Sequence, residues 1–197
     1  MRATRSGAFE YQLEAAAQNI YLSAGACNPS YVCMIMGDKR PFTHYDPYGG
    51  RLAEGEVVLG DCAPDYRYST SDIARIWPVN GEFSPAQRAF YDFPLAFQEC
   101  VLVQVKPGAT CQALVEQVHT IRRPIFQTWA FFCTEDKAHA ELIFQSKCFS
   151  HAVGMAVHDI GFHFRRPFEI GMVSSCEPGN FDQTGRQPPY GLKTWWR

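Results

Sequence analysis

The sequence of 197 residues contains no apolar run that approaches the ~20 residues needed to cross a bilayer. Its first residues, "MRATRSGAFEYQLEAA", lack the apolar core of a secretory signal. Its formal net charge is only −2, so neither nucleic acid nor an anionic membrane is expected as a partner. These absences predict one soluble globular domain that spans residues 1–197.

The eight cysteines do not show the CxxC spacing of a zinc site or a redox centre. They are scattered along the chain, and several lie within apolar runs, where a thiol behaves as a small hydrophobic side chain. We therefore expect reduced, structural cysteines. Because disulfides are rare in the cytoplasm, a cytoplasmic location is the default expectation.

Helical periodicity is present at the start of the chain. Residues 8–25 predict a helix, in which Phe9, Leu13 and Ile20 fall roughly on one face. The following apolar stretch "YVCMIM", residues 31–36, predicts a short strand.

A β-hairpin is predicted next along the chain. The segments "EVVLGDC" (56–62) and "YRYSTSDIARIWPV" (66–79) have strand-like composition, and Ala63-Pro64-Asp65 between them has turn chemistry. Two further helices have capping signals. Ser84, Pro85 and Gln87 form an N-cap, a first helical position and a capping box, and Thr110 can cap the second helix.

Proline and strand-like segments shape the remaining expectations. Pro94 is expected to bend or interrupt the helix that contains it. The segments "HAVGMAVHDIG" (151–161) and "MVSSC" (172–176) resemble strands. Helices and antiparallel hairpins without βαβ alternation predict a mixed α+β fold.

Polar residues interrupt this apolar, strand-like sequence at Asp61, Asp72, His151, His158 and Glu177. Each has a common structural interpretation, because Asp satisfies turn backbones, His is often a hydrogen-bonded core residue, and Glu occurs in loops. Taken together, these oxygen and nitrogen donors suit Mn²⁺, Co²⁺ or Zn²⁺ hydrolytic chemistry better than a thiolate-rich structural zinc site. Carboxylates can bridge two ions about 3.5–4 Å apart, which activate a shared water and polarise a carbonyl.

Three blocks of sequence carry a resemblance to a known family. They are "GDCAPDYRYSTSDIARIWPVNGEFSPAQRAFYD" (60–92), "SHAVGMAVHDIG" (150–161) and "EIGMVSSCEPGNF" (169–181). In this order they resemble the pita-bread metallopeptidases, specifically the aminopeptidase P and prolidase branch, which is related to methionine aminopeptidase and creatinase. The resemblance implies an antiparallel curved sheet covered by helices and a peptide substrate with proline at its second position.

The resemblance also implies roles for single residues. The metal ligands of the family fall on Asp61, Asp72, His151 and Glu177. Glu177 is further expected to take a proton from the attacking water. His44 and His158 match histidines that contact the substrate and its developing oxyanion.

The chain also departs from the family pattern. The family carries a fifth ligand, a Glu in a strand of the form G-I-R-I-E-D, and aligning Gly191-Leu192-Lys193 with G-I-R places Trp195 at its position. A histidine of the family is replaced by Lys147. We therefore expect one or two bound ions, with manganese as the first choice and the second ion weakly held.

The resemblance implies that 1–197 is a partial catalytic domain without the N-terminal domain of the family and with an incomplete C-terminal edge. A cut sheet edge predicts a homodimer. Three functions stay open: an Xaa-Pro peptidase, a catalytically impaired pita-bread homologue, and a creatinase-like C–N hydrolase that works without metal. The Asp-Asp-His-Glu set argues against the third.

Overall fold

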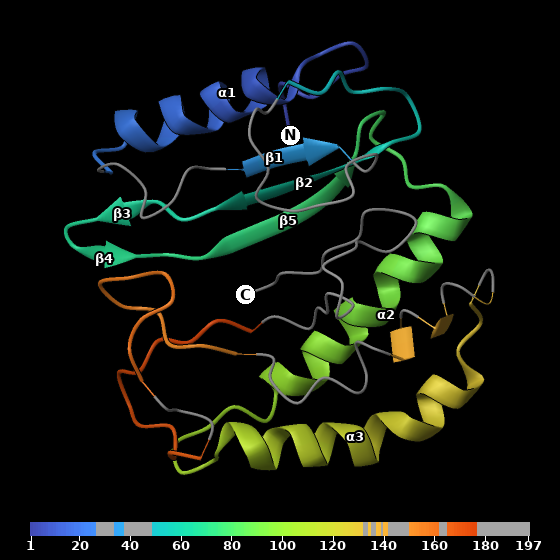
Figure 1. Cartoon of the computed structure of the whole chain (residues 1–197). Helices are drawn as coiled ribbons and strands as arrows, with labels where there is room; N and C mark the ends of the chain where they lie inside the picture. Colours follow the sequence, from blue (N-terminus) through green and yellow to red (C-terminus); the bar gives the residue numbers. More distant parts are fainter. Residues whose placement is uncertain are drawn as a thin grey trace.

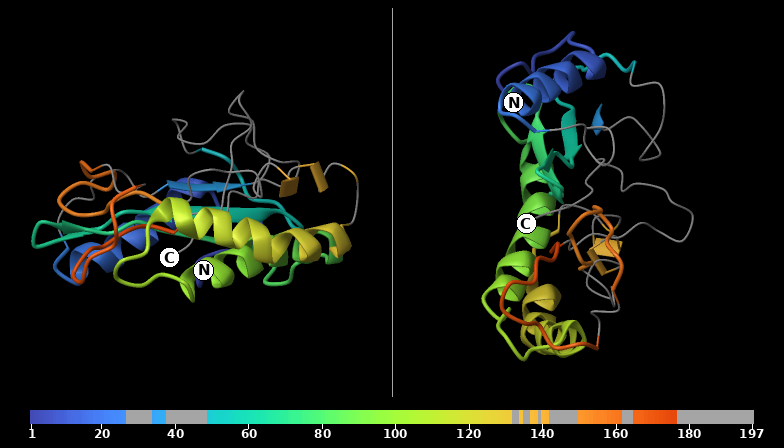
Figure 2. Two further views of the ribbon diagram at one scale, coloured as in Figure 1. Left: turned by 90° about the horizontal axis from the view of Figure 1, so that it is seen from below. Right: turned by 90° about the vertical axis from the view of Figure 1, so that its left-hand side faces the viewer.

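The computed structural model places a small sheet between one helix and a pair of helices. In Figure 1, α1 (Glu10–Ser23) lies on one side of the sheet, and α2 (Pro85–Leu102) and α3 (Cys111–Thr128) lie on the other. Figure 2 shows α1 and α3 at opposite ends of the molecule. The residues described are 1–26, 49–131, 134, 137–138, 140–141, 150–161 and 165–176, with the backbone alone of 34–37.

The first helix forms where the sequence predicts it. The Gln12 side chain accepts a hydrogen bond from the backbone N–H of Phe9, the N-cap, and so satisfies one donor that the helix leaves unpaired. Leu13 is buried against the sheet, whereas Ile20 is 64% exposed. Leu13 and Ile20 nevertheless line the same pocket between the helix and the sheet, as expected of residues on one helix face.

The sheet contains β1 (Met34–Gly37), β2 (Val57–Cys62) and β5 (Ile73–Pro78) in antiparallel order β1-β2-β5. Side chains alternate between the two faces of a strand. Val57 accordingly packs in the core toward α2, and Val58 packs in the core toward α1. Every residue of β2 is buried, because both faces of this central strand are covered.

The hairpin turns later than the sequence predicts. The chain does not reverse at 63–65 but continues into a two-stranded extension, β3 (Asp65–Tyr66) and β4 (Ser69–Thr70). Arg67 and Tyr68 make the turn, with φ of 54° and 65°. Two successive positive φ values are typical of the type I′ turn, whose twist matches that of the strands. The Asp65 carboxylate accepts the Tyr68 N–H at 2.9 Å and holds it closed.

The capping predictions for α2 and α3 are confirmed. The Ser84 hydroxyl accepts from Gln87 N–H, and the Gln87 side chain accepts from Ser84 N–H, both within 3.2 Å. The Thr110 hydroxyl accepts from the N–H of Ala113 at 3.1 Å. Pro94 does not interrupt α2, which continues through it to Leu102. Among the described helices, none has the combination of length and apolarity that a membrane crossing requires.

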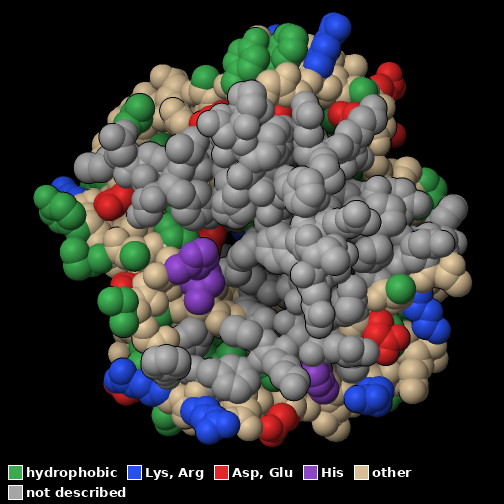
Figure 3. Space-filling view, viewed as in Figure 1, with side chains coloured by type: hydrophobic (Ala, Val, Ile, Leu, Met, Phe, Trp, Pro, Cys, Tyr) green, Lys and Arg blue, Asp and Glu red, His purple; other side chains and the backbone are tan. Residues whose placement is uncertain are grey.

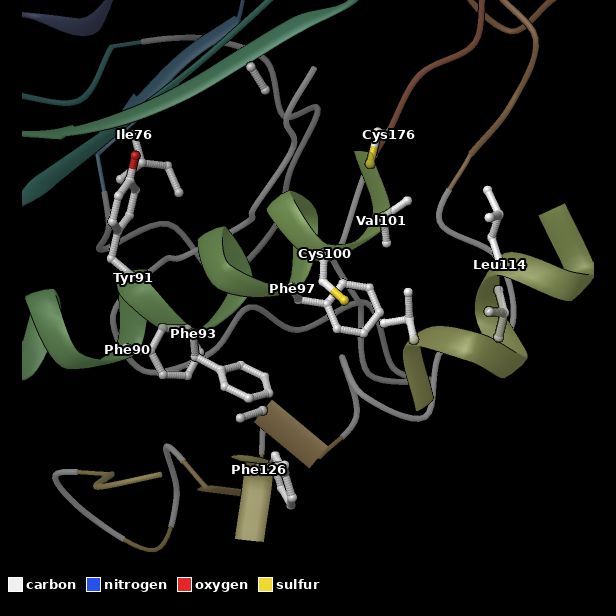
Figure 4. Close-up of a cluster of buried hydrophobic side chains, with 14 of the residues drawn as sticks. Ile76, Phe90, Tyr91, Phe93, Phe97, Cys100, Val101, Leu114, Phe126 and Cys176 are labelled. Carbon is white, nitrogen blue, oxygen red and sulfur yellow. The ribbon is translucent and has the colours of Figure 1, made fainter. Parts of the chain in front are cut away.

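The main core lies between the sheet and α2 with α3 (Figure 4). Aromatic residues of α2 fill it, and Phe93 contacts Phe126 edge-on at 5.5 Å between ring centroids. Edge-to-face pairs of this kind add stability beyond the area they bury. Because β2 and β5 supply the opposite wall, the sheet is held in place by α2.

The segments 151–161 and 172–176 are not strands, contrary to the sequence prediction. Within the described residues Ala152 and Ser174 form an isolated antiparallel bridge, Cys176 is a further bridge residue, and 154–158 are bends. Two backbone hydrogen bonds join the segments, from the Val153 N–H to the Val173 carbonyl and from the Ser175 N–H to the His151 carbonyl. Beyond them, backbone groups of 154–160 bond within the segment and to side chains, so no regular ladder forms.

The cysteines within the described residues are found in two states. Cys100, Cys111 and Cys176 are buried and reduced, as predicted. Cys62 at the end of β2 is disulfide-bonded, so the expectation of reduced cysteines was wrong there.

Candidate functional site

The two carboxylates predicted from the hairpin lie on one face of the sheet. Asp61 in β2 pairs with Ala74 of β5, and Asp72 precedes Ala74 by two positions. Residues directly opposite one another share a face, and so do residues two apart along a strand. Asp61 and Asp72 therefore both point toward the α2 side, where they are 3% and 5% exposed. The sequence predicted the hairpin, but its register is a finding of the structure.

Asp72 contacts His151, the histidine predicted as a metal ligand. The Oδ2 atom of Asp72 lies 3.1 Å from Nε2 of His151, across a sequence separation of 79 residues. The other ring nitrogen of His151, Nδ1, lies 3.0 Å from the carbonyl oxygen of Ala152. That carbonyl can only accept, so Nδ1 carries the proton.

This arrangement leaves two lone pairs facing each other. In the neutral ring with a protonated Nδ1, Nε2 is an acceptor, and the Asp72 carboxylate oxygen is also an acceptor. Two acceptors at 3.1 Å are stabilised only by a proton or a cation between them. A hydrogen bond from the second ring nitrogen to a backbone carbonyl is also the usual support of a metal-ligating histidine. The pair therefore has the chemistry of a metal site.

His158 completes a group of three donors. Its ring lies 4.4 Å from that of His151 between centroids, at an interplanar angle of 80°. Donor atoms of Asp72, His151 and His158 all lie within 4.8 Å of one another. Asp72 is buried, His151 is half-buried and His158 is exposed, so the group runs from the sheet to solvent. Histidine side chains are visible at the surface in Figure 3.

Backbone contacts on two sides hold His151 in place. Its N–H donates to the Ser175 hydroxyl at 3.0 Å, and its carbonyl accepts from the Ser175 N–H at 2.9 Å. The same segment is tied to the hairpin, because the N–H and the hydroxyl of Thr70 both donate to the carbonyl of Gly154, at 2.8 and 3.0 Å. Figure 1 shows this segment beside β3 and β4. Sequence analysis did not assign a role to Ser175, Thr70 or Gly154.

The remaining predicted residues divide into two cases. Asp61 is described and buried, but it does not belong to the group of three donors. His44 and Glu177 fall outside the described residues, as do Lys147 and Trp195.

A pocket among the described residues lies away from this group of donors. It has a volume of about 530 Å³ and lies between α1 and the opposite face of the sheet, where Leu13, Tyr21 and Trp77 are among the residues that line it. Burial raises the pKa of the Tyr21 phenol. Its lining is predominantly apolar and includes no carboxylate, so this pocket does not offer the donors of a metal site.

The chain was compared with known protein families, and residues 1–192 match the family described as "Metallopeptidase family M24". The chain belongs to this family. The M24 chain is 31% identical over 189 residues to an Xaa-Pro aminopeptidase of Escherichia coli, covering 91% of this chain and 42% of that protein. It is 26% identical to a human Xaa-Pro dipeptidase, again covering 91% of this chain and 42% of that protein.

Solved structures give the same result for the fold. Proline aminopeptidase P II from Yersinia pestis superposes with a TM-score of 0.77 and 32% identity, covering 99% of this chain and 47% of that one. Zinc-substituted Escherichia coli aminopeptidase P in complex with product gives 0.78 and 28% identity, covering 98% and 47%. The predicted α+β, pita-bread fold is therefore confirmed for this M24 chain, which spans less than half the length of these relatives.

Proposed function

We propose that this chain is a divalent-metal-dependent peptidase that cleaves the bond before a proline at the second position of a peptide. The observation that carries the proposal is the contact at 3.1 Å between Asp72 Oδ2 and His151 Nε2, two donor atoms that a divalent cation can share. The relatives named Xaa-Pro aminopeptidase and Xaa-Pro dipeptidase support the choice of substrate.

The residues that would hold the metal are Asp61, Asp72 and His151, together with Glu177 from outside the described part. Carboxylate and imidazole donors suit Mn²⁺, with Co²⁺ or Zn²⁺ as the alternatives. When bound, a divalent ion supplies an activated water and polarises the scissile carbonyl. Asp61 and Asp72 are both buried, so a divalent ion between them would be held away from bulk water.

The other residues would act on substrate and water. His158 is exposed beside His151 and can donate a hydrogen bond to the oxygen that gains charge in the transition state. His44 is proposed for the same task from the substrate side. Glu177 would accept the proton that water loses when it attacks the carbonyl.

An Xaa-Pro peptide assay with added Mn²⁺ tests this proposal. The wild type should release the residue before proline, and Asp72→Ala should lose that activity. Asp92→Ala is the matched control, because Asp92 is a carboxylate on α2 that pairs with Arg88 away from the site. Equal activity in wild type and Asp72→Ala would contradict a metal mechanism.

A catalytically impaired homologue is the second candidate, and Trp195 at the position of the family's fifth ligand favours it. Tryptophan has no lone pair to offer a metal. A competent peptidase should bind two ions per chain in a metal analysis, whereas an impaired homologue should bind one or none. The predicted homodimer and cytoplasmic location stay predictions, the first of which light scattering of the purified chain would test.

A further inference from the structure

A single carboxylate shapes the segment that carries both histidines. Asp159 Oδ2 accepts the N–H of Met155 at 3.0 Å, and its Oδ1 accepts the N–H of Ile160 at 2.7 Å. The two oxygens thus close the turn from both ends. Hydrogen bonds to an ionised acceptor are shorter and stronger than neutral ones, so this carboxylate can replace the ladder that the segment lacks.

Glycine at position 154 is what lets the carboxylate approach. A Cβ atom built on Gly154 would lie 2.1 Å from Asp159 Oδ2, far inside van der Waals contact. The N–H of Gly154 donates to the carbonyl of Ala156 at 3.1 Å, which tightens the same turn. Any side chain at this position would force Asp159 away from Met155.

One carbonyl connects this turn to His151. The oxygen of Ala152 accepts the backbone N–H of Asp159 at 3.0 Å and also lies 3.0 Å from Nδ1 of His151. A carbonyl has two lone pairs, and here one supports the turn while the other orients the imidazole. The Ala152 carbonyl thus links the backbone of Asp159 to the imidazole of His151.

We infer that Asp159 is a positioning residue, which holds the turn closed and through Ala152 keeps Nε2 of His151 directed at Asp72. The inference rests on the proposed function for its consequence, since a correctly directed Nε2 is what a metal requires. His158 precedes Asp159 in the chain, so the same turn also presents His158 to solvent beside His151. The Ala152 carbonyl supports His151 directly, and loss of such a support typically costs about 10–100-fold in metal affinity. Asp159 acts through this carbonyl.

The test compares Asp159→Ala and Asp159→Asn with Asp92→Asn as the control. Amide hydrogen exchange at Met155 and Ile160 reports whether the turn is closed. A long-range ¹H–¹⁵N spectrum reports which nitrogen of His151 carries the proton. Co²⁺ affinity, followed by its visible absorption, reports the consequence for metal binding.

In Asp159→Ala we expect faster exchange at both amides, loss of the single His151 tautomer, and Co²⁺ binding weakened by about 10–100-fold. Asp159→Asn keeps one acceptor oxygen, so its effects should be smaller. Gly154→Ala should reproduce the alanine variant, because the added Cβ displaces the carboxylate. The control should match the wild type throughout.

An Asp159→Ala protein that keeps the His151 tautomer and the Co²⁺ affinity of the wild type would overturn the inference. If that variant does not fold, the asparagine variant decides by the same criteria. Failure of the proposed function looks different, because the wild type would then bind no Co²⁺. The exchange and tautomer measurements would still show whether Asp159 positions His151.

Discussion

The two halves of the candidate site are built in different ways. Asp61 lies within a regular antiparallel ladder and Asp72 lies at the end of one, and both strands of that ladder also wall the core. His151 and His158 lie on a segment whose shape depends on hydrogen bonds from side chains, chiefly those of Asp159, Thr70 and Ser175. The hairpin thus shares its stability with the whole fold, whereas the segment 150–161 depends on a few local bonds.

This difference has a consequence for dynamics. Regions with few buried apolar contacts and many hydrogen bonds near solvent open at lower free energy than core strands do. Met155, His158 and Ile160 are exposed, whereas every residue of β2 is buried. We expect the hairpin to supply a rigid carboxylate platform and the segment 150–161 to supply ligands that can adjust when a metal or a peptide binds.

The largest effect is expected from removing the ligand that joins the two halves. Asp72→Ala should weaken Co²⁺ binding by more than the about 10–100-fold that loss of an outer support costs, because a ligand and its charge are both lost. Calorimetric titration with Co²⁺ measures the change, and Asp92→Ala controls for the loss of a surface carboxylate. Unchanged affinity in Asp72→Ala would mean that the hairpin is not part of a metal site.

The next effect compares equal truncations in the two halves. Val57 in β2 is 1% exposed and Val157 in the segment is 4% exposed. Val57→Ala should lower the free energy of unfolding by about 2 kcal/mol, from ~0.8 kcal/mol per buried methylene plus the cavity. Val157→Ala should cost less, because an irregular segment can collapse into the space. Urea unfolding measures the free energy of unfolding of both variants. Equal losses would contradict the expectation that the hairpin is rigid and that the segment 150–161 can adjust.

A smaller effect is expected from the hydrogen bond that joins the hairpin to the segment 150–161. Thr70→Val keeps the shape of the side chain and the backbone N–H, but removes the hydroxyl bond to the Gly154 carbonyl. About 0.5–1.5 kcal/mol should be lost locally, which would raise amide exchange in 152–160 by about 2–10-fold. The matched control is Thr120→Val, which removes a hydroxyl bond to a carbonyl within α3. Equal exchange in the segment for both variants would show that Thr70 does not restrain it.

The smallest expected effect is a pH dependence of the folding stability that arises from Tyr91, a buried residue of the core. Burial raises the pKa of the Tyr91 phenol, and the charge of Asp92 raises it further. The charges of Arg75 and Arg88 lower this pKa, but the net result is an increase. Above the ordinary tyrosine pKa of about 10, the unfolded chain loses this proton while the folded chain keeps it, so stability falls as pH rises.

Urea unfolding at pH values on either side of about 10 should therefore show a steeper loss in the wild type than in Tyr91→Phe. Tyr66→Phe is the control, because Tyr66 in β3 is 50% exposed. The same pH dependence in wild type and Tyr91→Phe would assign the effect to other groups.

Local signals in the sequence predicted the helices well. Ser84, Gln87 and Thr110 cap their helices as expected, because a capping hydrogen bond spans only three residues and needs no tertiary context. The turn at 63–65 was predicted wrongly because Pro64 resembles a turn former, whereas the register of β2 with β5 carries the chain further before it reverses.

The strand prediction for 151–161 failed for a related reason. Alternating apolar residues describe a side-chain pattern, but a strand also needs a neighbour for its backbone groups, and here the Asp159 carboxylate takes part of that role. Sequence analysis likewise missed Asp159 as a support, although Gly154 before it marks a close approach of another group.

The sequence by itself determined which residue types are available for chemistry, the α+β class, and the family to which the chain is similar. Only the tertiary structure decided that Asp72 and His151, 79 residues apart, meet at 3.1 Å, and that His158 lies beside them. The physical reason is that caps and periodicity are properties of neighbouring residues, whereas register and the closure of a long loop depend on packing across the whole chain.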